Sequence, residues 1–225
     1  TIEKRLKSAG IAPSDENRRA YRELLLTTPG LGEFISGVIL FDETLRQRTA
    51  DGAPLIEALR RQAIIPGIKV DRGAKPLAGF PEEKITEGLD GLRERLAEYE
   101  TLGARFAKWR AVIAILAGKP TPTCLAANAH ALARYAALAQ EAGLVPIVEP
   151  EVLMDGEHSI ARHAEVTEET LHHVFHALRE HRVRLEAMLL KPNMVLSGTT
   201  CASQAGAAEV AAATLACRRR AVPSA

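Results

Sequence analysis

Short apolar segments alternate with amphipathic segments along most of the chain. The apolar segments are rich in Val and Ile and end at Gly, Pro or a charged residue, which is typical of buried strands. These predicted strands cover residues 36–41, 65–71, 104–112, 144–152 and 186–194. The amphipathic segments carry apolar residues three and four positions apart, which predicts helices. The predicted helices cover residues 43–48, 85–103, 128–143 and 167–182.

Residues at the ends of the predicted helices agree with this pattern. Thr167, with the glutamates that follow it, is a typical helix start, and Gly103 and Gly143 lie just past two helix ends. Strands that alternate with helices predict a parallel sheet covered by helices, either a (β/α)8 TIM barrel or an open doubly wound sheet. No GxGxxG turn follows a predicted strand, which argues against a dinucleotide-binding sheet. Because no linker interrupts the pattern, we expect residues 1–225 to form a single α/β domain.

Composition narrows the classes of partner. The 225 residues are 47% hydrophobic, enough for a large core, and 29 Lys and Arg residues balance 28 Asp and Glu residues. Balanced charge gives no general attraction to nucleic acid or to an anionic membrane, and 4% aromatic residues disfavour a base-stacking surface. No apolar run approaches the roughly 18 residues of a spanning helix. We therefore expect a cytoplasmic protein with neither a nucleic-acid nor a membrane partner.

Charged residues follow the apolar part of four successive predicted strands. Alternate residues of a strand point to the same face, so a charge that recurs at every second position marks one face. The charged residues placed in this way are Lys69, Lys108 with Arg110, Glu149 with Glu151, and Lys191, and Asp71 shares a face with Lys69. In a barrel, the carboxyl ends of the strands carry the chemistry. We expect these side chains to meet there and to leave positive potential for an anionic substrate.

Lys191 is unusual because the apolar run "AMLL" leads directly into it, and Pro192 follows. Apolar surroundings would favour the neutral amine, as would the like charge of Lys108. A neutral lysine amine can attack a carbonyl and form a Schiff base. Glu149 or Glu151 could then protonate the departing hydroxyl of the carbinolamine. The spacing leaves a second interpretation open, in which Lys191 is one half of a buried salt bridge with Glu149.

Long ordered strings of this sequence resemble the class I fructose-bisphosphate aldolases, the metal-independent Schiff-base family. The strings include "GIKVD", "GARFAKWR", "GLVPIVEPEVLMDGEH" and "LLKPNMV", and the resemblance runs from end to end. It implies a (β/α)8 barrel that needs no cofactor and is usually a homotetramer. It also implies reversible cleavage of a sugar bisphosphate, fructose 1,6-bisphosphate, into dihydroxyacetone phosphate and glyceraldehyde 3-phosphate.

The resemblance assigns roles to particular residues. Lys191 matches the lysine that forms the Schiff base, and Glu149 matches the acid and base of the carbinolamine steps. Glu151 matches a neighbouring active-site carboxylate, and Lys108 matches a lysine that contacts the substrate. Four further cations match the group that binds the phosphate remote from the Schiff base, namely Lys69, Arg110, Lys4 and Arg5.

Several parts of the family pattern have no counterpart in these 225 residues. They are the first strand with its Ala-Ala-Asp-Glu-Ser string and catalytic aspartate, the last two strands with their Ser-Gly-Gly and Tyr-Gly-Arg segments, and the C-terminal tail. The resemblance therefore implies that about five of the eight barrel strands are represented. This leaves a catalytically silent, aldolase-like interaction protein or an inactive fragment as an alternative. Another Schiff-base lyase, such as a transaldolase-like enzyme, is a further alternative, although the basic residues favour a bisphosphate.

The remaining motifs are interpreted as structural. His172 and His176 in "HHVFH" lie four residues apart, as metal ligands on a helix can, but an outer helix would hold them far from the strand ends. We expect solvated histidines and no metal site. Cys124, Cys201 and Cys217 have no CxxC spacing, so they are interpreted as free thiols. Trp109 should pack in the core, and the arginines of "CRRR" should complement a helix dipole.

Overall fold

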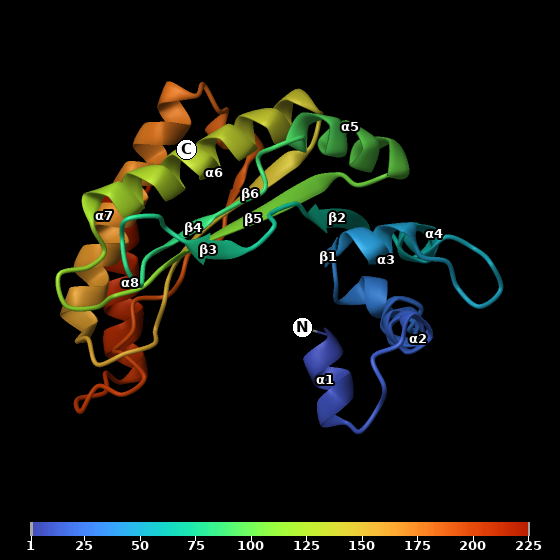
Figure 1. Cartoon of the computed structure of the whole chain (residues 1–225), viewed down its shortest axis with the longest axis horizontal. Coiled ribbons are helices and arrows are strands. Elements are labelled where there is room, and N and C mark those ends of the chain that lie inside the picture. The colour runs from blue at the N-terminus through green and yellow to red at the C-terminus, as the bar shows by residue number, and fades with distance from the viewer. Residues whose placement is uncertain (1, 225) are drawn as a thin grey trace.

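A five-stranded parallel sheet organises the chain (Figure 1). This computed structural model describes residues 2–224. The strands pair in the order β1, β2, β5, β6, β7, so each strand pairs with the strand of this sheet that precedes it in the sequence. Their bounds are Gly37–Leu40 for β1, Ile65–Lys69 for β2, Phe106–Ile113 for β5, Val145–Val152 for β6 and Leu189–Leu190 for β7. The prediction of a parallel α/β sheet is confirmed.

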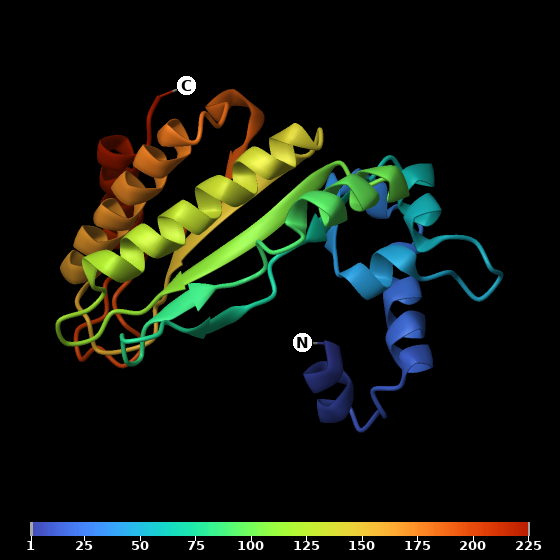
Figure 2. The ribbon, with the colours of Figure 1, turned by 45° about the horizontal axis from the view of Figure 1, so that its top comes forward.

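Long helices cover one face of this sheet (Figure 2). α5 (Leu92–Leu102) precedes β5, α6 (Pro122–Glu141) joins β5 to β6, and α7 (Ile160–Glu180) joins β6 to β7. α6 packs on β5 and β6, α7 packs on α6, and α8 (Ala207–Ala221) packs on α7. This succession of strand, helix and parallel strand is the arrangement that the alternating sequence pattern predicts.

Smaller elements lie around this framework. The N-terminal helices α1 and α2, blue in Figure 2, lie at the end of the molecule opposite α7 and α8. A short antiparallel hairpin of β3 and β4 packs beside β5. The bounds of these elements are Ile2–Ser8 for α1, Asp15–Leu26 for α2, Leu31–Glu33 for η1, Asp42–Arg46 for α3, Leu55–Arg61 for α4, Ala74–Pro76 for β3, Lys84–Thr86 for β4 and Leu185–Ala187 for η2.

The face of the sheet under the helices is fully apolar. Ile68 of β2, Trp109 of β5 and Val148 of β6 are all 0% exposed. Trp109 stacks on Tyr135 of α6, with ring centroids 5.6 Å apart. The prediction that Trp109 packs in the core, away from its charged neighbours, is therefore confirmed.

The opposite face is apolar where the strands begin and charged where they end. Ile65, Phe106, Val145 and Leu189 line a hollow of about 340 Å³ near the amino ends of the strands. Phe106 lies directly over Gly67, because a Cβ at position 67 would be only 2.1 Å from Cε2 of that ring. The charged residues follow toward the carboxyl ends, which is the end where the sequence predicts a site.

Three predicted helices have different starts. The segment 128–143 belongs to α6, which begins at Pro122. The segment 85–103 becomes a helix only at Leu92, because residues 84–86 form β4. The segment 167–182 belongs to a longer helix that begins at Ile160, where the Ser159 side chain accepts a hydrogen bond from Arg162 N at 3.2 Å. Thr167 is therefore not a helix start. It is buried in the middle of α7, where hydrophobic packing outweighs its preference for a cap.

The predicted strand 186–194 is the largest error. Only residues Leu189–Leu190 pair with β6, and η2 precedes them. Lys191 N still donates to Val148 O at 2.9 Å, but Pro192 has no N–H and cannot continue the ladder. The apolar composition predicts a strand, and Pro192 shortens it because its nitrogen cannot donate to the ladder.

Other local predictions are confirmed. Gly103 caps α5 in the left-handed region at φ 106°, and Gly143 follows α6 at φ 74°. Arginines 218–220 lie in the last turn of α8. His172 and His176 are exposed on α7, as expected for an outer helix.

Three further features concern membrane spans, metal sites and cysteines among the described residues. Among residues 2–224, no helix combines the length and apolarity that crossing a bilayer requires. Within the same range, no three His, Cys, Asp or Glu side chains are grouped so that they could hold a metal ion. All three cysteines are free thiols, and two of them, Cys124 and Cys217, are buried.

A pair of histidines lies at the start of α7. His163 is 0% exposed, and its ring stacks on His158 with centroids 5.1 Å apart. Nδ1 of His163 accepts a hydrogen bond from Leu196 N at 3.4 Å. Burial and the neighbouring His158 lower the pKa of His163 to about 4, and burial also lowers the pKa of His158. Both rings are therefore neutral in the folded protein at neutral pH.

Replacing Trp109 with alanine should lower the free energy of unfolding by about 3–5 kcal/mol. The change removes a fully buried indole and its stacking on Tyr135. Urea unfolding measures the loss, and Trp109→Phe, which keeps an aromatic ring, is the matched control and should lose much less. Equal losses in the two variants would contradict the central place of the indole.

Stability should fall as the pH drops from about 6.5 toward about 4. The unfolded chain takes up a proton on His163 near pH 6.5, whereas the folded protein takes it up only near pH 4. His163 alone should lower the free energy of unfolding by about 2 kcal/mol between pH 7 and pH 5. Urea unfolding at both pH values tests this against His163→Asn, which keeps an acceptor for Leu196 N but cannot titrate. The variant should lose less, and an equal loss would refute the assignment to His163.

Candidate active site

Side chains from four strands form a chain of alternating charge across the sheet. It runs from Lys69 at the end of β2 through Asp71, Lys108 of β5 and Glu149 of β6 to Lys191 just after β7. Each contact joins a cation to a carboxylate. The sequence predicts that charges from these strand ends meet. The structure brings Lys69, Lys108, Glu149 and Lys191 together, with Asp71 between Lys69 and Lys108.

Among these five residues, Asp71 has the most deeply buried side chain, which is only 3% exposed. Oδ2 lies 3.7 Å from Lys108 Nζ and accepts from Arg110 N at 3.3 Å. Oδ1 accepts from Lys69 Nζ and, at 3.1 Å, from Gly73 N. Two ammonium groups and two amides thus compensate for the removal of this carboxylate from water.

Glu149 is the second buried carboxylate, with its side chain 7% exposed. Oε2 lies 3.2 Å from Lys108 Nζ, and Oε1 accepts from Lys191 Nζ. One glutamate therefore joins the two lysines that the resemblance places at the reaction centre. At this depth, opposite unit charges about 4 Å apart attract by about 4 kcal/mol.

Lys191 differs from its expected environment. Its side chain is 58% exposed, so the apolar run before it does not bury the amine. Leu189, which faces the same way, is also 56% exposed. β7 pairs with β6 along one edge, and no other described strand pairs with its second edge. The apolar run packs only in part, which is why the expected desolvation of Lys191 is wrong for the described residues. The alternative of a buried salt bridge is half right, because Glu149 is buried and Lys191 is not.

Arg110 and Glu151 form a separate pair further along β5 and β6. Arg110 Nε donates to Glu151 Oε2, and the two side chains are 43% and 32% exposed. Only the backbone N–H of Arg110 touches the alternating chain, through Asp71. Glu151 is thus a neighbour of the site and does not contact Lys191 in this arrangement.

Lys4 and Arg5 are not brought into the alternating chain. Both lie exposed on α1. A pocket of about 630 Å³ lies between α1, α2 and β1, and Lys69 borders it together with Ile2 and Glu3 of α1. The structure therefore places α1 near Lys69 but lines the shared pocket with other residues of that helix.

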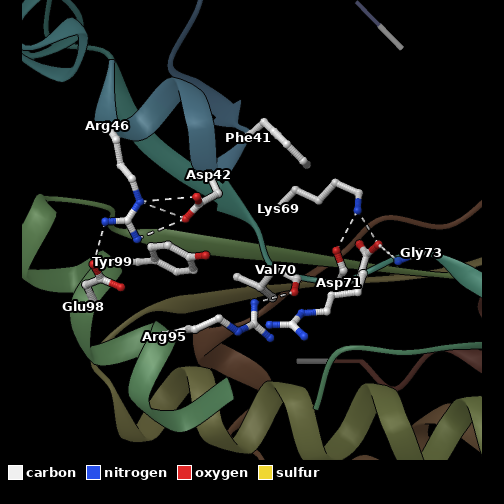
Figure 3. A pocket seen from close by; sticks show the side chains of 11 residues that line it. Phe41, Asp42, Arg46, Lys69, Val70, Asp71, Gly73, Arg95, Glu98 and Tyr99 are labelled. Carbon is white, nitrogen blue, oxygen red and sulfur yellow. Dashed lines mark hydrogen bonds and ion pairs between the residues drawn. The ribbon is translucent and has the colours of Figure 1, made fainter. Parts of the chain in front are cut away.

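A second pocket, of about 540 Å³, opens on the other side of Lys69 and Asp71 (Figure 3). Its far wall holds Arg46, which bridges Asp42 and Glu98 and lies 5.9 Å from the centroid of the Tyr99 ring. Partial burial alone would raise the pKa of Asp42. Hydrogen bonds from Arg46 and Tyr99 outweigh it and leave this pKa below its usual value. Hydrogen bonds to both carboxylates raise the pKa of Arg46. This ion-paired wall was not predicted from the sequence.

Arg95 supports the same region from α5. Its guanidinium donates to Val70 O at 3.0 Å and to Gly88 O. It therefore ties the segment between Lys69 and Asp71 to the loop after β4. No spacing rule marks Arg95 in the sequence, because its role depends on carbonyl groups brought near it by the fold.

The arrangement can support covalent chemistry on a carbonyl compound. The exposed amine of Lys191 is open to a ligand, and Glu149 beside it can move protons. Lys108, behind Glu149, can stabilise negative charge that develops during a reaction. Asp71 holds Lys108 from the opposite side. The sequence pattern places Asp71 on the same face as Lys69, but no motif marks it as a candidate site residue.

Comparison with known proteins agrees with the motifs. The family model described as fructose-bisphosphate aldolase class-I matches residues 1–225. A probable fructose-bisphosphate aldolase class 1 of Xanthomonas axonopodis pv. citri is 62% identical over 224 residues, which cover 100% of this chain and 67% of that protein. The chloroplastic fructose-bisphosphate aldolase 1 of Chlamydomonas reinhardtii is 54% identical over 227 residues, which cover 100% of this chain and 59% of that protein.

The fold agrees as closely as the sequence. A crystal structure of fructose-bisphosphate aldolase from Plasmodium falciparum, solved in complex with TRAP and a small molecule inhibitor, superimposes with a TM-score of 0.97 at 50% identity. The match covers 99% of this chain and 65% of that one, so the strands described above correspond to part of a barrel. The chain spans about two thirds of the length of these relatives or less. It belongs to the class I fructose-bisphosphate aldolases, a family of lyases.

Proposed function

We propose that the protein cleaves fructose 1,6-bisphosphate reversibly into dihydroxyacetone phosphate and glyceraldehyde 3-phosphate, through a Schiff base on Lys191. The single observation that carries the proposal is the contact of the exposed Lys191 amine with the buried Glu149, which Lys108 contacts from the other side. An amine that a ligand can reach, next to a group that moves protons, is what iminium formation requires. Membership of the aldolase family supports the same chemistry.

The proposed reaction begins when the amine of Lys191 attacks C2 of the ketose. Glu149 gives a proton to the resulting hydroxyl, which leaves as water, and the nitrogen becomes a positively charged iminium. Glu149, now a carboxylate, takes the proton of the C4 hydroxyl as the C3–C4 bond breaks, and C4 leaves as the aldehyde group of glyceraldehyde 3-phosphate. The electron pair of the broken bond moves toward C2 and neutralises the iminium to an enamine. Lys108 lies close enough to Glu149, 3.2 Å from Oε2, to stabilise the charge that changes there. A proton on C3 and a water on C2 then release dihydroxyacetone phosphate.

Cations near the strand ends fit a bisphosphate. Lys69 borders both pockets beside the alternating chain, and the Arg110 side chain is 43% exposed. In the proposal these two bind the phosphate remote from Lys191, and Lys4 and Arg5 act at the same end of the substrate. These four cations favour a bisphosphate aldolase over a transaldolase-like enzyme. The homotetramer that the resemblance implies and the cytoplasmic location expected from the sequence remain predictions.

Sodium borohydride should trap a covalent adduct on Lys191 when fructose 1,6-bisphosphate is present, because it reduces the iminium to a stable amine. Mass spectrometry of peptides locates the modified lysine. Lys191→Arg keeps the positive charge but cannot form the iminium, so it should give no adduct and no detectable cleavage. Lys75→Arg, an exposed lysine of the β3–β4 hairpin, is the control and should be trapped like the wild type.

Two results would count against the proposed function. A wild-type protein that gives no adduct on Lys191 would favour a catalytically silent, aldolase-like interaction protein. Loss of cleavage activity in EDTA would point to a metal-dependent enzyme, because a Schiff-base mechanism uses no metal ion.

Asp71→Asn should lower kcat/KM by roughly 10-fold or more, equivalent to about 1.4 kcal/mol of transition-state stabilisation. The amide has the same shape but cannot balance the charges of Lys69 and Lys108. Steady-state cleavage rates test this against Glu83→Gln, which changes another buried carboxylate that accepts from Thr121 N at 2.7 Å and is not part of the alternating chain. Equal losses in the two variants would show that Asp71 acts only through general stability.

A further inference from the structure

The main chain after Lys191 lacks the support that a strand normally gives. β7 contains only Leu189–Leu190, and the bond from Lys191 N to Val148 O is its last backbone contact with β6. Pro192 has no N–H to donate. After Lys191, no ladder of backbone hydrogen bonds to β6 fixes the position of the main chain among the described residues.

The side chain of Asn193 takes over this task. Its Oδ1 accepts from Val152 N, the last residue of β6, at 3.0 Å. Its Nδ2 donates to Thr167 Oγ1 and to Met194 O, each at 3.1 Å. Val152 N–H can only donate, so the amide oxygen must face it and the amide nitrogen must face Thr167. Asn193 thereby occupies the place of a strand partner for the end of β6.

Buried polar groups of the helices hold the next residues. Thr167 is 3% exposed in α7, and its Oγ1 lies 3.4 Å from Nδ1 of His163. The same Nδ1 accepts from Leu196 N at 3.4 Å, and Val195 N donates to Thr214 Oγ1 of α8 at 2.9 Å. Hydrogen bonds that involve side chains therefore hold residues 193, 195 and 196, in place of a ladder between backbone groups.

These contacts bear directly on Lys191. Its amine contacts Glu149, and its side chain is 58% exposed, so little packing restrains its four rotatable carbons. The position of the amine then depends on the main chain on both sides of the lysine. β7 fixes that chain before Lys191, and the contacts of Asn193 and Thr167 fix it afterwards.

We propose that Asn193 and Thr167 are positioning residues that fix the main chain beside Lys191, so that its amine meets Glu149. The inference rests on the proposed Schiff-base function of Lys191. Neither residue touches the substrate in this role. Both act through the lysine, and the effect belongs to the chemical step more than to substrate binding.

Thr167→Val tests the role, because valine keeps the shape of the side chain and removes the hydroxyl. We expect kcat for cleavage to fall on the order of 10-fold or more, with KM changed by less than about twofold, since misplaced reacting groups slow the chemistry. The rate at which borohydride traps the adduct on Lys191 should fall by a similar factor. Thr167→Ser, which keeps a hydroxyl, should recover most of kcat.

A matched control lies one turn further along α7. Thr170 is also buried, at 4% exposure, but its hydroxyl donates to Val166 O within the same helix at 2.7 Å. Thr170→Val should therefore keep the wild-type kcat. Asn193→Ala removes the amide that donates to Thr167 Oγ1, at a position that is only partly buried. If Thr167→Val does not fold, Asn193→Ala is the variant that tests the role.

The outcomes separate this inference from the proposed function. If the wild type is trapped on Lys191 and both Thr167→Val and Asn193→Ala are trapped as fast, the positioning role is overturned and the proposed function stands. A kcat within twofold of wild type together with a lower Tm would show a purely structural role. If the wild type itself gives no adduct, the proposed function fails and the positioning role fails with it.

Discussion

The alignment of the strands at their carboxyl ends depends on two buried carboxylates that share one lysine. Removing the carboxylates of Asp71 and Glu149 from water requires nearby cations to offset the lost hydration, and Lys108 lies between them. These residues come from three neighbouring strands, so the contacts form only when every register is right. A slip of β5 by one residue would turn Lys108 under the helices and Trp109 onto the charged face. Packing on one face and ion pairing on the other therefore specify the same alignment.

Much of the fold could be predicted from the sequence because its signals are local. Apolar runs located the central strands, three- and four-residue spacing located α6 and α7, and Gly103 and Gly143 marked helix ends. The short elements were harder to predict. Residues 85–86 of β4 fall at the start of a predicted helix, and β3 lies outside the predicted elements. For α8, only the arginines at its end indicate a helix. None of these elements has a strong pattern. The strand around Lys191 was predicted too long, since its composition favours a strand and only Pro192 argues against one.

The candidate site was predicted in part, for a physical reason. Alternation along a strand shows which charges share a face, and this placed Lys69, Lys108, Glu149 and Lys191 together. It cannot show depth, so the exposure of Lys191 and the burial of Asp71 were not foreseen. Residues that act through backbone groups, such as Arg95 and Asn193, leave no periodic signal. Their partners are carbonyl and amide groups that only the folded chain brings within reach.

The ring of Phe106 over Gly67 has a consequence for how this sequence can diverge. The two positions share one fixed volume, because any side chain at position 67 would collide with the ring. A larger residue at 67 is tolerated only if position 106 becomes smaller at the same time. Substitutions at the two positions should therefore covary among homologues, although one position lies in β2 and the other in β5.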